Sequence, residues 1–442
     1  MNTIIIKRWF TTKIIFVLLG ILILVCCADY VYYRQKFFPG IYVKDQYLGN
    51  KTPSEAEELL ENLQLIFKGP EGESTSLSLK SMGIEPVTRE IIFQGYQKGR
   101  KHIWPINYLE RLRIKKGVHI NFPYEIQQDF FNRRLDELIN TFNSEARDAN
   151  FEIIDGDAVL IPEKTGFLVQ KEKLIDKIIN TLELDKTSLT VSVPGQKIPP
   201  VFTISHLEEM GLTHQMASFT TLFDASYETR AHNIELASSI LDQHLIAPGE
   251  TFSFNNIIGD TTPGKGYKEA LIIQGGEYVT GFGGGVCQVS TTLYNTALLS
   301  NLPIVDRHNH RFMAAYISAG RDAAVSYGVY DLQFRNNRDH YILLLSHVEN
   351  GEITMALVGC EMNEEIEIKT RYLNFIEPSL KIEMTSQLAP GEEEKIEGKP
   401  GATLEVWKIV HQAGGEKKEE KLSVDSYQPY PAVIRRGIPP GN

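Results

Sequence analysis

Cysteine is scarce in this chain: only four occur among its 442 residues. Cys26 and Cys27 fall in an apolar leader, so Cys287 and Cys360 alone remain for the rest of the protein. Two cysteines cannot build the disulfide framework of a small secreted domain, and no Cys-x-x-Cys motif is present for zinc or redox chemistry. A single bridge between Cys287 and Cys360 stays open, because spacing alone does not decide whether two cysteines meet.

Basic charge is also in short supply. The chain has 45 Lys and Arg against 56 Asp and Glu, which gives a net charge of -11. Binding to phosphate backbones needs a basic surface, so nucleic acid is excluded as a partner. Bulk charge does not favour anionic wall polymers either, so any such ligand needs a specific site. The length predicts about three domains of roughly 150 residues.

The leader lacks a small-residue cleavage site after its apolar run, residues 14–28. Basic residues precede the run and tyrosines extend it, so residues 14–33 reach bilayer thickness. The absent cleavage site favours an uncleaved anchor over a removed signal peptide. We therefore predict a cytoplasmic tail (1–13), a single transmembrane anchor (14–33) and an extracellular location in the cell envelope for the rest.

The body of the chain predicts a multi-domain α+β protein. An α+β spacer module occupies residues 38–105, and a second module occupies 106–200 and includes a hairpin over Asp155-Gly156. A third domain covers 213–360, and a small module rich in β-formers and glycine turns covers 364–442. The first two modules hold no cluster of nucleophile, base and acid, which indicates a binding or spacing role.

The sharpest feature is the glycine run that ends at Cys287. Val286, Val289, Leu293 and Ala297 recur at helical spacing, so a helix is predicted to start near the cysteine. Unpaired N–H groups and the positive end of the helix dipole stabilise a thiolate there. The same N–H groups can hold the oxyanion of acyl transfer.

This segment has two other interpretations. Free cysteine is among the most buried residue types, so Cys287 can be a packing residue. A phosphate-binding loop is disfavoured, because no Gly-Lys-Ser/Thr follows the glycines.

A thiolate nucleophile needs a base nearby, and His308 and His310 follow the helix. If residues 304–312 form a strand, the two imidazoles lie on the same face of it, and one of them can lie close to the Cys287 sulfur. Alternatively, both are surface histidines. A zinc site on the pair lacks a third ligand, so neither a metal nor a cofactor is predicted.

Two further groups complete the predicted site. Asp322 can orient a histidine, and Arg321 can hold a carboxylate by a two-point hydrogen bond, although a structural ion pair is the alternative for each. Cys287, His310, His308 and Asp322 are the predicted catalytic residues. Substrate contacts are predicted for Gly284, Gly285, Gln288, Ser290, Arg321 and Tyr327.

Five segments, taken in order, resemble the motifs of the VanW family: 248–255, 283–298, 307–310, 322–328 and 331–336. Residues 106–197 resemble the peptidoglycan-binding domain that often precedes wall transpeptidases, and the tail resembles a small extracellular β module named for its glycines. Some VanW proteins are viewed as cysteine L,D-transpeptidases. The resemblance implies that Cys287 is the nucleophile and His310 its partner, with Arg311 where the family often has a small residue.

These observations predict an anchored envelope protein that acts on peptidoglycan stem peptides. The leading hypothesis is a cysteine L,D-transpeptidase that forms 3-3 crosslinks through a Cys287 thioester. The alternatives are a non-catalytic peptidoglycan-binding or scaffold protein and a hydrolase in which water accepts the acyl group.

Overall fold

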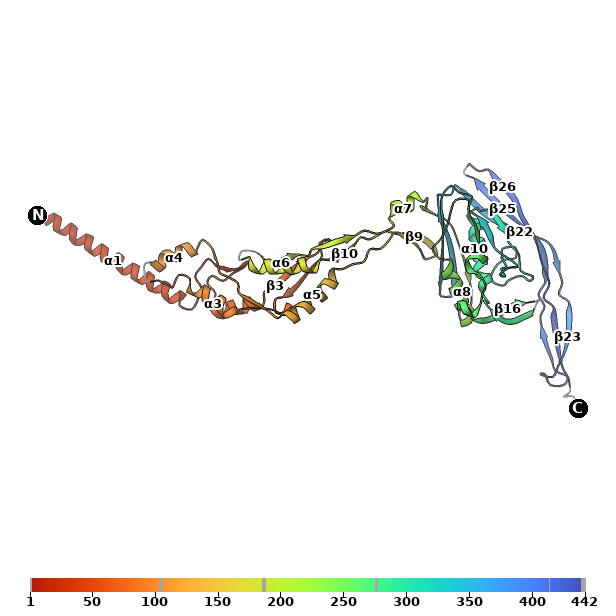
Figure 1. Cartoon of the computed structure of the whole chain (residues 1–442), viewed down its shortest axis with the longest axis horizontal. Coiled ribbons are helices and arrows are strands. Elements are labelled where there is room, and N and C mark those ends of the chain that lie inside the picture. The colour runs from red at the N-terminus through yellow and green to blue at the C-terminus, as the bar shows by residue number, and fades with distance from the viewer. Residues whose placement is uncertain (1, 103–105, 185–187, 275–276, 413, 439–442) are drawn as a thin grey trace. The chain divides into compact units, whose positions relative to one another are not determined.

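The computed structural model describes residues 2–102, 106–184, 188–274, 277–412 and 414–438. The chain forms two compact units. The first comprises residues 1–147 and 165–199, and the second comprises 148–164 and 200–442. Each mixes helices with several small sheets, which confirms the α+β class (Figure 1).

The first unit begins with one long helix, α1 (Asn2–Tyr33). Its segment Phe16–Tyr33 is apolar enough to cross a membrane, and none of that segment is buried. In water such a surface would be unfavourable, whereas a bilayer would cover it. Among the described residues this is the one helix with that property.

The remainder of the first unit alternates short strands with helices around one core. Its sheets have the orders β2-β1-β6, β11-β3-β4, β10-β12 and β5-β7. Helix α2 starts with a capping box in which Thr52 and Glu55 satisfy each other's backbone N–H groups. The elements are β1 (Ile41–Val43), β2 (Gln46–Tyr47), α2 (Pro53–Glu61), β3 (Gln64–Lys68), β4 (Ser74–Ser78), η1 (Lys80–Met82), β5 (Ile84–Pro86), α3 (Thr88–Gln97), α4 (Ile106–Ile114), β6 (Val118–His119), β7 (Tyr124–Ile126), α5 (Gln128–Phe142), β10 (Gly166–Val169), α6 (Lys171–Glu183), β11 (Thr190–Ser192) and β12 (Gly195–Ile198).

The second unit is built on the sheet β13-β21-β20-β14. Smaller sheets have the orders β15-β19-β18, β22-β25-β26, β23-β27-β24, β16-β17 and β8-β9. The elements are β8 (Asn150–Ile154), β9 (Asp157–Ile161), α7 (Ile204–Glu209), β13 (His214–Leu222), α8 (Glu228–Leu241), β14 (His244–Ile246), β15 (Thr251–Ser253), α9 (Phe254–Ile258), η2 (Pro263–Lys265), β16 (Glu269–Gln274), β17 (Glu277–Phe282), α10 (Val286–Leu299), β18 (Ile304–Asp306), β19 (Gln333–Arg335), β20 (Ile342–Glu349), β21 (Glu352–Gly359), β22 (Glu364–Ile376), β23 (Leu380–Thr385), β24 (Glu393–Ile396), β25 (Gly401–Gln412), β26 (Lys417–Tyr427) and β27 (Ala432–Gly437).

The hairpin predicted over Asp155-Gly156 is confirmed as β8 paired with β9. Both turn residues have positive φ, 53° and 88°, as a two-residue hairpin turn requires. The hairpin packs in the second unit, where Phe151 joins a core cluster with Leu207 and Leu345.

Helix α10 is enclosed by its neighbours and starts close to where the sequence predicts it. All of its residues are buried except Cys287 and Leu299. Its polar residues are hydrogen-bonded inside the unit; Thr292, for example, lies 2.8 Å from the Thr221 hydroxyl on β13. The helix therefore has a fixed position, and Cys287 near its start is half-buried.

Gly285 sets the turn into α10, and we predict that an alanine there destabilises the second unit. Its φ is +109°, and an added Cβ would lie 2.8 Å from Ile234 Cγ1. Backbone strain of this kind costs about 1–3 kcal/mol. Pulse proteolysis in urea, read from peptides of the second unit, should show Gly285→Ala unfolding at lower urea than the parent chain.

Gly264→Ala is the matched control, because the nearest atom to its added Cβ is 3.9 Å away. Equal midpoints for the two alanine variants would show that Gly285 carries no special constraint.

Candidate functional site

Cys287 is the second residue of α10, directly after the turn at Gly285. The N–H groups of Val286 and Gln288 donate to the carbonyls of Gly283 (3.1 Å) and Gly285 (2.9 Å). The Cys287 N–H between them meets no acceptor among the described residues. The first turn of a helix thus offers a free donor and the positive end of its dipole beside the sulfur.

The segment that follows Asp322 joins this helix start to the histidines. The Cys287 thiol donates to Val325 O at 3.4 Å, and Ser290 Oγ donates to Ala323 O at 2.7 Å. On its other side the segment pairs with His308, because the Ala324 N–H donates to His308 O at 2.8 Å. The chain around His308 is therefore held beside the first turns of α10.

His310 and Asp322 form a close pair next to the sulfur. The Asp322 carboxylate, 1% exposed, accepts from both His310 Nδ1 and the His310 backbone N–H at 2.6 Å. Because a carboxylate only accepts, Nδ1 carries a hydrogen and Nε2 is left for the thiol. The side chains of Cys287 and His310 are hydrogen-bonded, so the three residues form a cysteine–histidine–aspartate relay.

The charges in this relay favour an ion pair. Burial alone would raise the pKa of the Cys287 thiol, but the hydrogen bond and charge of His310 bring that pKa below its ordinary value. Burial alone would lower the pKa of His310, but its hydrogen bonds to Asp322 and Cys287 raise the pKa to about 10. These shifts favour the thiolate–imidazolium pair over the neutral pair, and a cysteine nucleophile is activated in the same direction.

Asp322 is kept ionised in turn. Burial works to raise the pKa of this carboxyl, but the bond and charge of His310 and the charge of Arg307 hold the pKa below its usual value. Arg307 Nη2 lies 3.1 Å from Asp322 Oδ1, and Arg307 Nε donates to Asp322 O at 2.7 Å. The sequence placed Arg307 in a motif but gave no signal for this partner.

His308 is not brought to the sulfur. The predicted strand 304–312 is wrong beyond Asp306, because β18 ends there and His308 forms only an isolated bridge. The His308 side chain is 41% exposed, and Nε2 lies 3.1 Å from Asp306 Oδ1. Its ring lies 4.6 Å from that of Tyr330. The arrangement thus selects His310 from the predicted pair.

Two of the predicted substrate contacts are engaged within the protein. Gln288 is 1% exposed; its amide donates to Thr221 Oγ1 (3.0 Å) and Leu222 O (2.9 Å) and accepts from Arg230. Ser290 is fully buried and donates to Ala323 O. Both fix the start of α10 rather than face solvent.

The other predicted substrate contacts lie in different surroundings: the two glycines are crowded, Arg321 is partly buried, and Tyr327 is exposed. Gly284 has no room for a Cβ, which would lie 2.7 Å from Leu271 O, and Gly285 is crowded as described above. The Arg321 guanidinium lies 4.9 Å above the Phe219 ring, and its Nε and Nη2 are buried without a hydrogen-bond partner. Tyr327 is 58% exposed.

Residues that the sequence did not single out also lie in this region. The Tyr316 hydroxyl is buried, and a charge on Cys287 adds to the burial that raises the pKa of this phenol. Arg230, at the start of α8, reaches Gln288. Neither belongs to a recognisable motif, so no local signal identifies them.

No metal site is found among the described residues, because they contain no group of three or more His, Cys, Asp or Glu suited to an ion. Cys287 and Cys360 are both free thiols, so the structure does not contain the bridge that the sequence left open.

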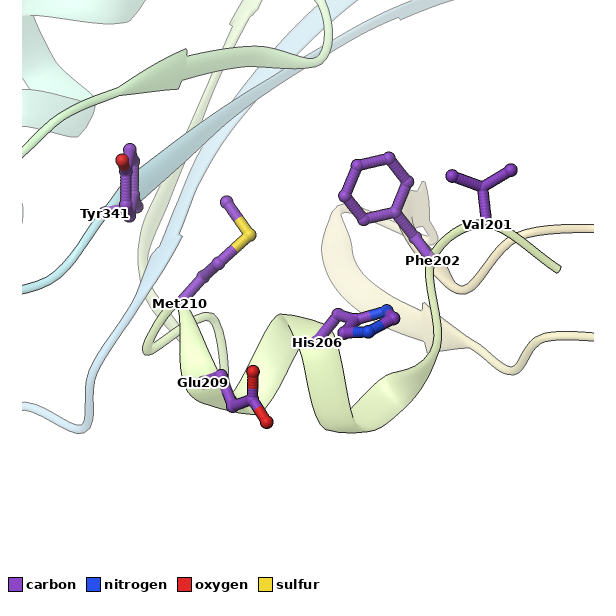
Figure 2. A pocket seen from close by; sticks show the side chains of 6 residues that line it. All are labelled: Val201, Phe202, His206, Glu209, Met210 and Tyr341. Carbon is purple, nitrogen blue, oxygen red and sulfur yellow. The ribbon is translucent and has the colours of Figure 1, made fainter.

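A pocket of ≈ 490 Å³ lies elsewhere in the second unit, around α7 (Figure 2). It contains no cysteine and no nucleophile paired with a base. It is lined by Val201, Phe202, His206, Glu209, Met210 and Tyr341.

We predict that His310→Gln slows alkylation of Cys287 by iodoacetamide at pH 7. The variant keeps the burial that raises the thiol pKa but loses the cation that lowers it. The midpoint of the rate–pH profile should therefore move upward, and at pH values below both midpoints the rate should be about tenfold lower for each unit of the move. Mass spectrometry of the Cys287 peptide measures the rate separately from the other cysteines.

His308→Gln is the matched control and should give the parent profile, because its ring contacts Tyr330 rather than the sulfur. A parent-like profile for His310→Gln would mean that the imidazole does not hold the thiolate.

Cys287, His310 and Asp322 all fall within a segment that matches a family model. Residues 229–358 match the family model described as "VanW like protein", and residues 75–189 match the one described as "Putative peptidoglycan binding domain". The uncharacterized protein YoaR of Bacillus subtilis is 33% identical over 210 residues, which cover 48% of this chain and 69% of that protein. The vancomycin B-type resistance protein VanW of Enterococcus faecalis is 37% identical over 125 residues, covering 27% of this chain and 46% of the relative.

Among solved structures, the G5 domain of an IgA1 protease is 23% identical and covers 18% of this chain and 98% of that domain. The TM-score is 0.13, so this match carries no argument, and the expected identity of the tail stays a prediction. The matched domain, the two relatives and the resemblance of the motifs together show that the chain belongs to the VanW family.

Proposed function

We propose that this protein is a cysteine L,D-transpeptidase of the cell envelope, with Cys287 as nucleophile, His310 as acid and base, and Asp322 as the group that orients His310. The relay of these three side chains at the start of α10 is the observation that carries the proposal. Membership of the VanW family and the peptidoglycan-binding match direct it to peptidoglycan.

The first half-reaction forms a thioester. The Cys287 thiolate attacks the carbonyl that joins the third stem residue to the terminal D-Ala, and a C–S bond forms. The Cys287 N–H, which has no acceptor among the described residues, donates to the oxyanion. The C–N bond then breaks, and the His310 imidazolium gives its proton to the leaving amine of D-Ala.

The second half-reaction returns the enzyme to its starting state. The neutral imidazole of His310 takes a proton from the side-chain amine of a neighbouring stem, and that amine attacks the thioester. The C–S bond breaks, the thiolate leaves and is again paired with the imidazolium, and the product is a 3-3 crosslink. With water as acceptor, the same site would instead release a shortened stem.

Other parts of the chain suit this role. The apolar helix α1 serves as the anchor, and the bulk of the chain then lies on the outer side of the cell membrane, where its substrate is. Arg321 is the proposed ligand of a substrate carboxylate, since two of its guanidinium nitrogens have no hydrogen-bond partner among the described residues. Tyr327, which is exposed, is proposed to contact the stem peptide.

We predict that Cys287→Ala abolishes 3-3 crosslinking by the purified full-length protein on tetrapeptide muropeptides, a loss of about 10³-fold or more. Loss of the sulfur removes the thioester, so no acyl-enzyme adduct should be seen by mass spectrometry. Cys360→Ala, which removes the other free thiol of the same unit, should keep full activity.

The products separate the competing functions. Dimers of a tripeptide donor and a tetrapeptide acceptor support transpeptidation, whereas tripeptides without dimers identify a hydrolase. If Cys287→Ala and the parent chain give identical muropeptides, the protein is a non-catalytic wall-binding or scaffold protein and the proposal fails.

A further inference from the structure

The loop that carries His310 rests on the C-terminal sheet β22-β25-β26. The Gln428 N–H donates to Arg311 O at 2.8 Å, and Asn309 Nδ2 donates to Ser426 O at 3.1 Å. These bonds hold both neighbours of His310 against the chain at the end of β26. The sheet therefore fixes the path of the loop.

Apolar packing joins the other end of the loop to the same sheet. Ala319 is buried in a cluster with Leu404, Val406 and Tyr427. A Cβ at Gly320 would lie 2.7 Å from Val406 Cγ2, so the backbone lies directly on β25. Loop and sheet share one small core.

The end of β26 also reaches the catalytic carboxylate. Tyr427 is fully buried, and its hydroxyl accepts from the Gly320 N–H at 2.8 Å and donates to Asp322 Oδ1. Two residues earlier, Asp425 binds Arg307 Nη1 at 2.7 Å, and Arg307 binds Asp322. A single strand thus supports Asp322 directly and through an arginine.

The two oxygens of Asp322 bind different groups. Oδ1 accepts from Tyr427 and Arg307, whereas Oδ2 accepts from the ring and the backbone of His310. Because Tyr427 and Arg307 both bind Oδ1, the carboxylate cannot rotate freely. The orientation of the imidazole is therefore set by groups behind the carboxylate.

We propose that the C-terminal sheet is a structural part of the active site and that Tyr427 is a positioning residue acting on His310 through Asp322. The inference rests on the proposed cysteine relay. It extends the site beyond residue 358, where the VanW match ends.

The test is the rate–pH profile of Cys287 alkylation in the full-length protein carrying Tyr427→Phe. Loss of the hydroxyl leaves Arg307 as the remaining side-chain donor to Oδ1 and loosens the hold of Asp322 on His310, so the thiolate loses support and the midpoint moves upward. We expect the midpoint to rise by about one unit, which lowers the rate about tenfold at pH values below both midpoints. The substitution leaves the other titratable groups around the cluster in place: Arg230, Tyr294, Tyr316, Arg321 and Asp425.

A double-mutant cycle with Asp322→Asn separates positioning from general damage. If Tyr427 acts through Asp322, the Tyr427→Phe substitution should have no further effect in the Asp322→Asn background. Tyr372→Phe, on β22 of the same sheet with a 45% exposed ring, should match the parent chain. Should Tyr427→Phe fail to fold, Arg307→Lys takes its place in the cycle, since it keeps the charge but loses the fork that joins Asp322 to Asp425.

An unchanged or lowered midpoint for Tyr427→Phe, or effects that add independently with Asp322→Asn, overturns the inference. If Asp322→Asn itself leaves the profile unchanged, the relay is wrong and the proposed function fails before Tyr427 is in question.

Discussion

The buried carboxylate of Asp322 is the interaction on which the second unit depends most. An isolated charge in this position would be very unfavourable, and it is tolerated because donors surround it. His310, Arg307 and Tyr427 come from two loop positions and a distant strand, and each binds the same group. The need to satisfy this one charge thus links the loop that carries His310, beside Cys287, to the C-terminal sheet β22-β25-β26.

Local features of this arrangement could be predicted from the sequence. The glycine run and the apolar spacing after it predicted a helix starting near Cys287, because turn chemistry and helix periodicity act over a few residues. The hairpin over Asp155-Gly156 was predicted for the same reason. The resemblance to the VanW family favoured His310 over His308, but the residues alone did not decide between the two, since the choice depends on where β18 ends and on how the segment after Asp322 pairs with the loop.

Contacts between distant parts of the chain lie outside such reasoning. Tyr427 follows Asp322 by 105 positions, and no motif marks either Tyr427 or Asp425.

Gln288 and Ser290 were predicted to face a substrate because they follow the cysteine. Gln288, one position further along the helix, points away from Cys287. Ser290, three positions further, lies on nearly the same face as Cys287, yet it is buried and bound to Ala323 O. Polar character near a nucleophile therefore does not distinguish a ligand-binding side chain from one that fixes the helix.

The hairpin β8–β9 has a practical consequence for dividing the chain. Residues 148–164 belong with the second unit, although the sequence on both sides of them belongs with the first. A fragment starting at residue 200 would carry the sulfur and its relay but would uncover the apolar surface that Ala149 and Phe151 protect, at Leu207, Leu343 and Val358. Exposed apolar surface of this kind promotes aggregation. The smallest piece that keeps this core closed includes the hairpin, and a cut before residue 148 that retains the hairpin also retains residues 165–199, which belong with the first unit.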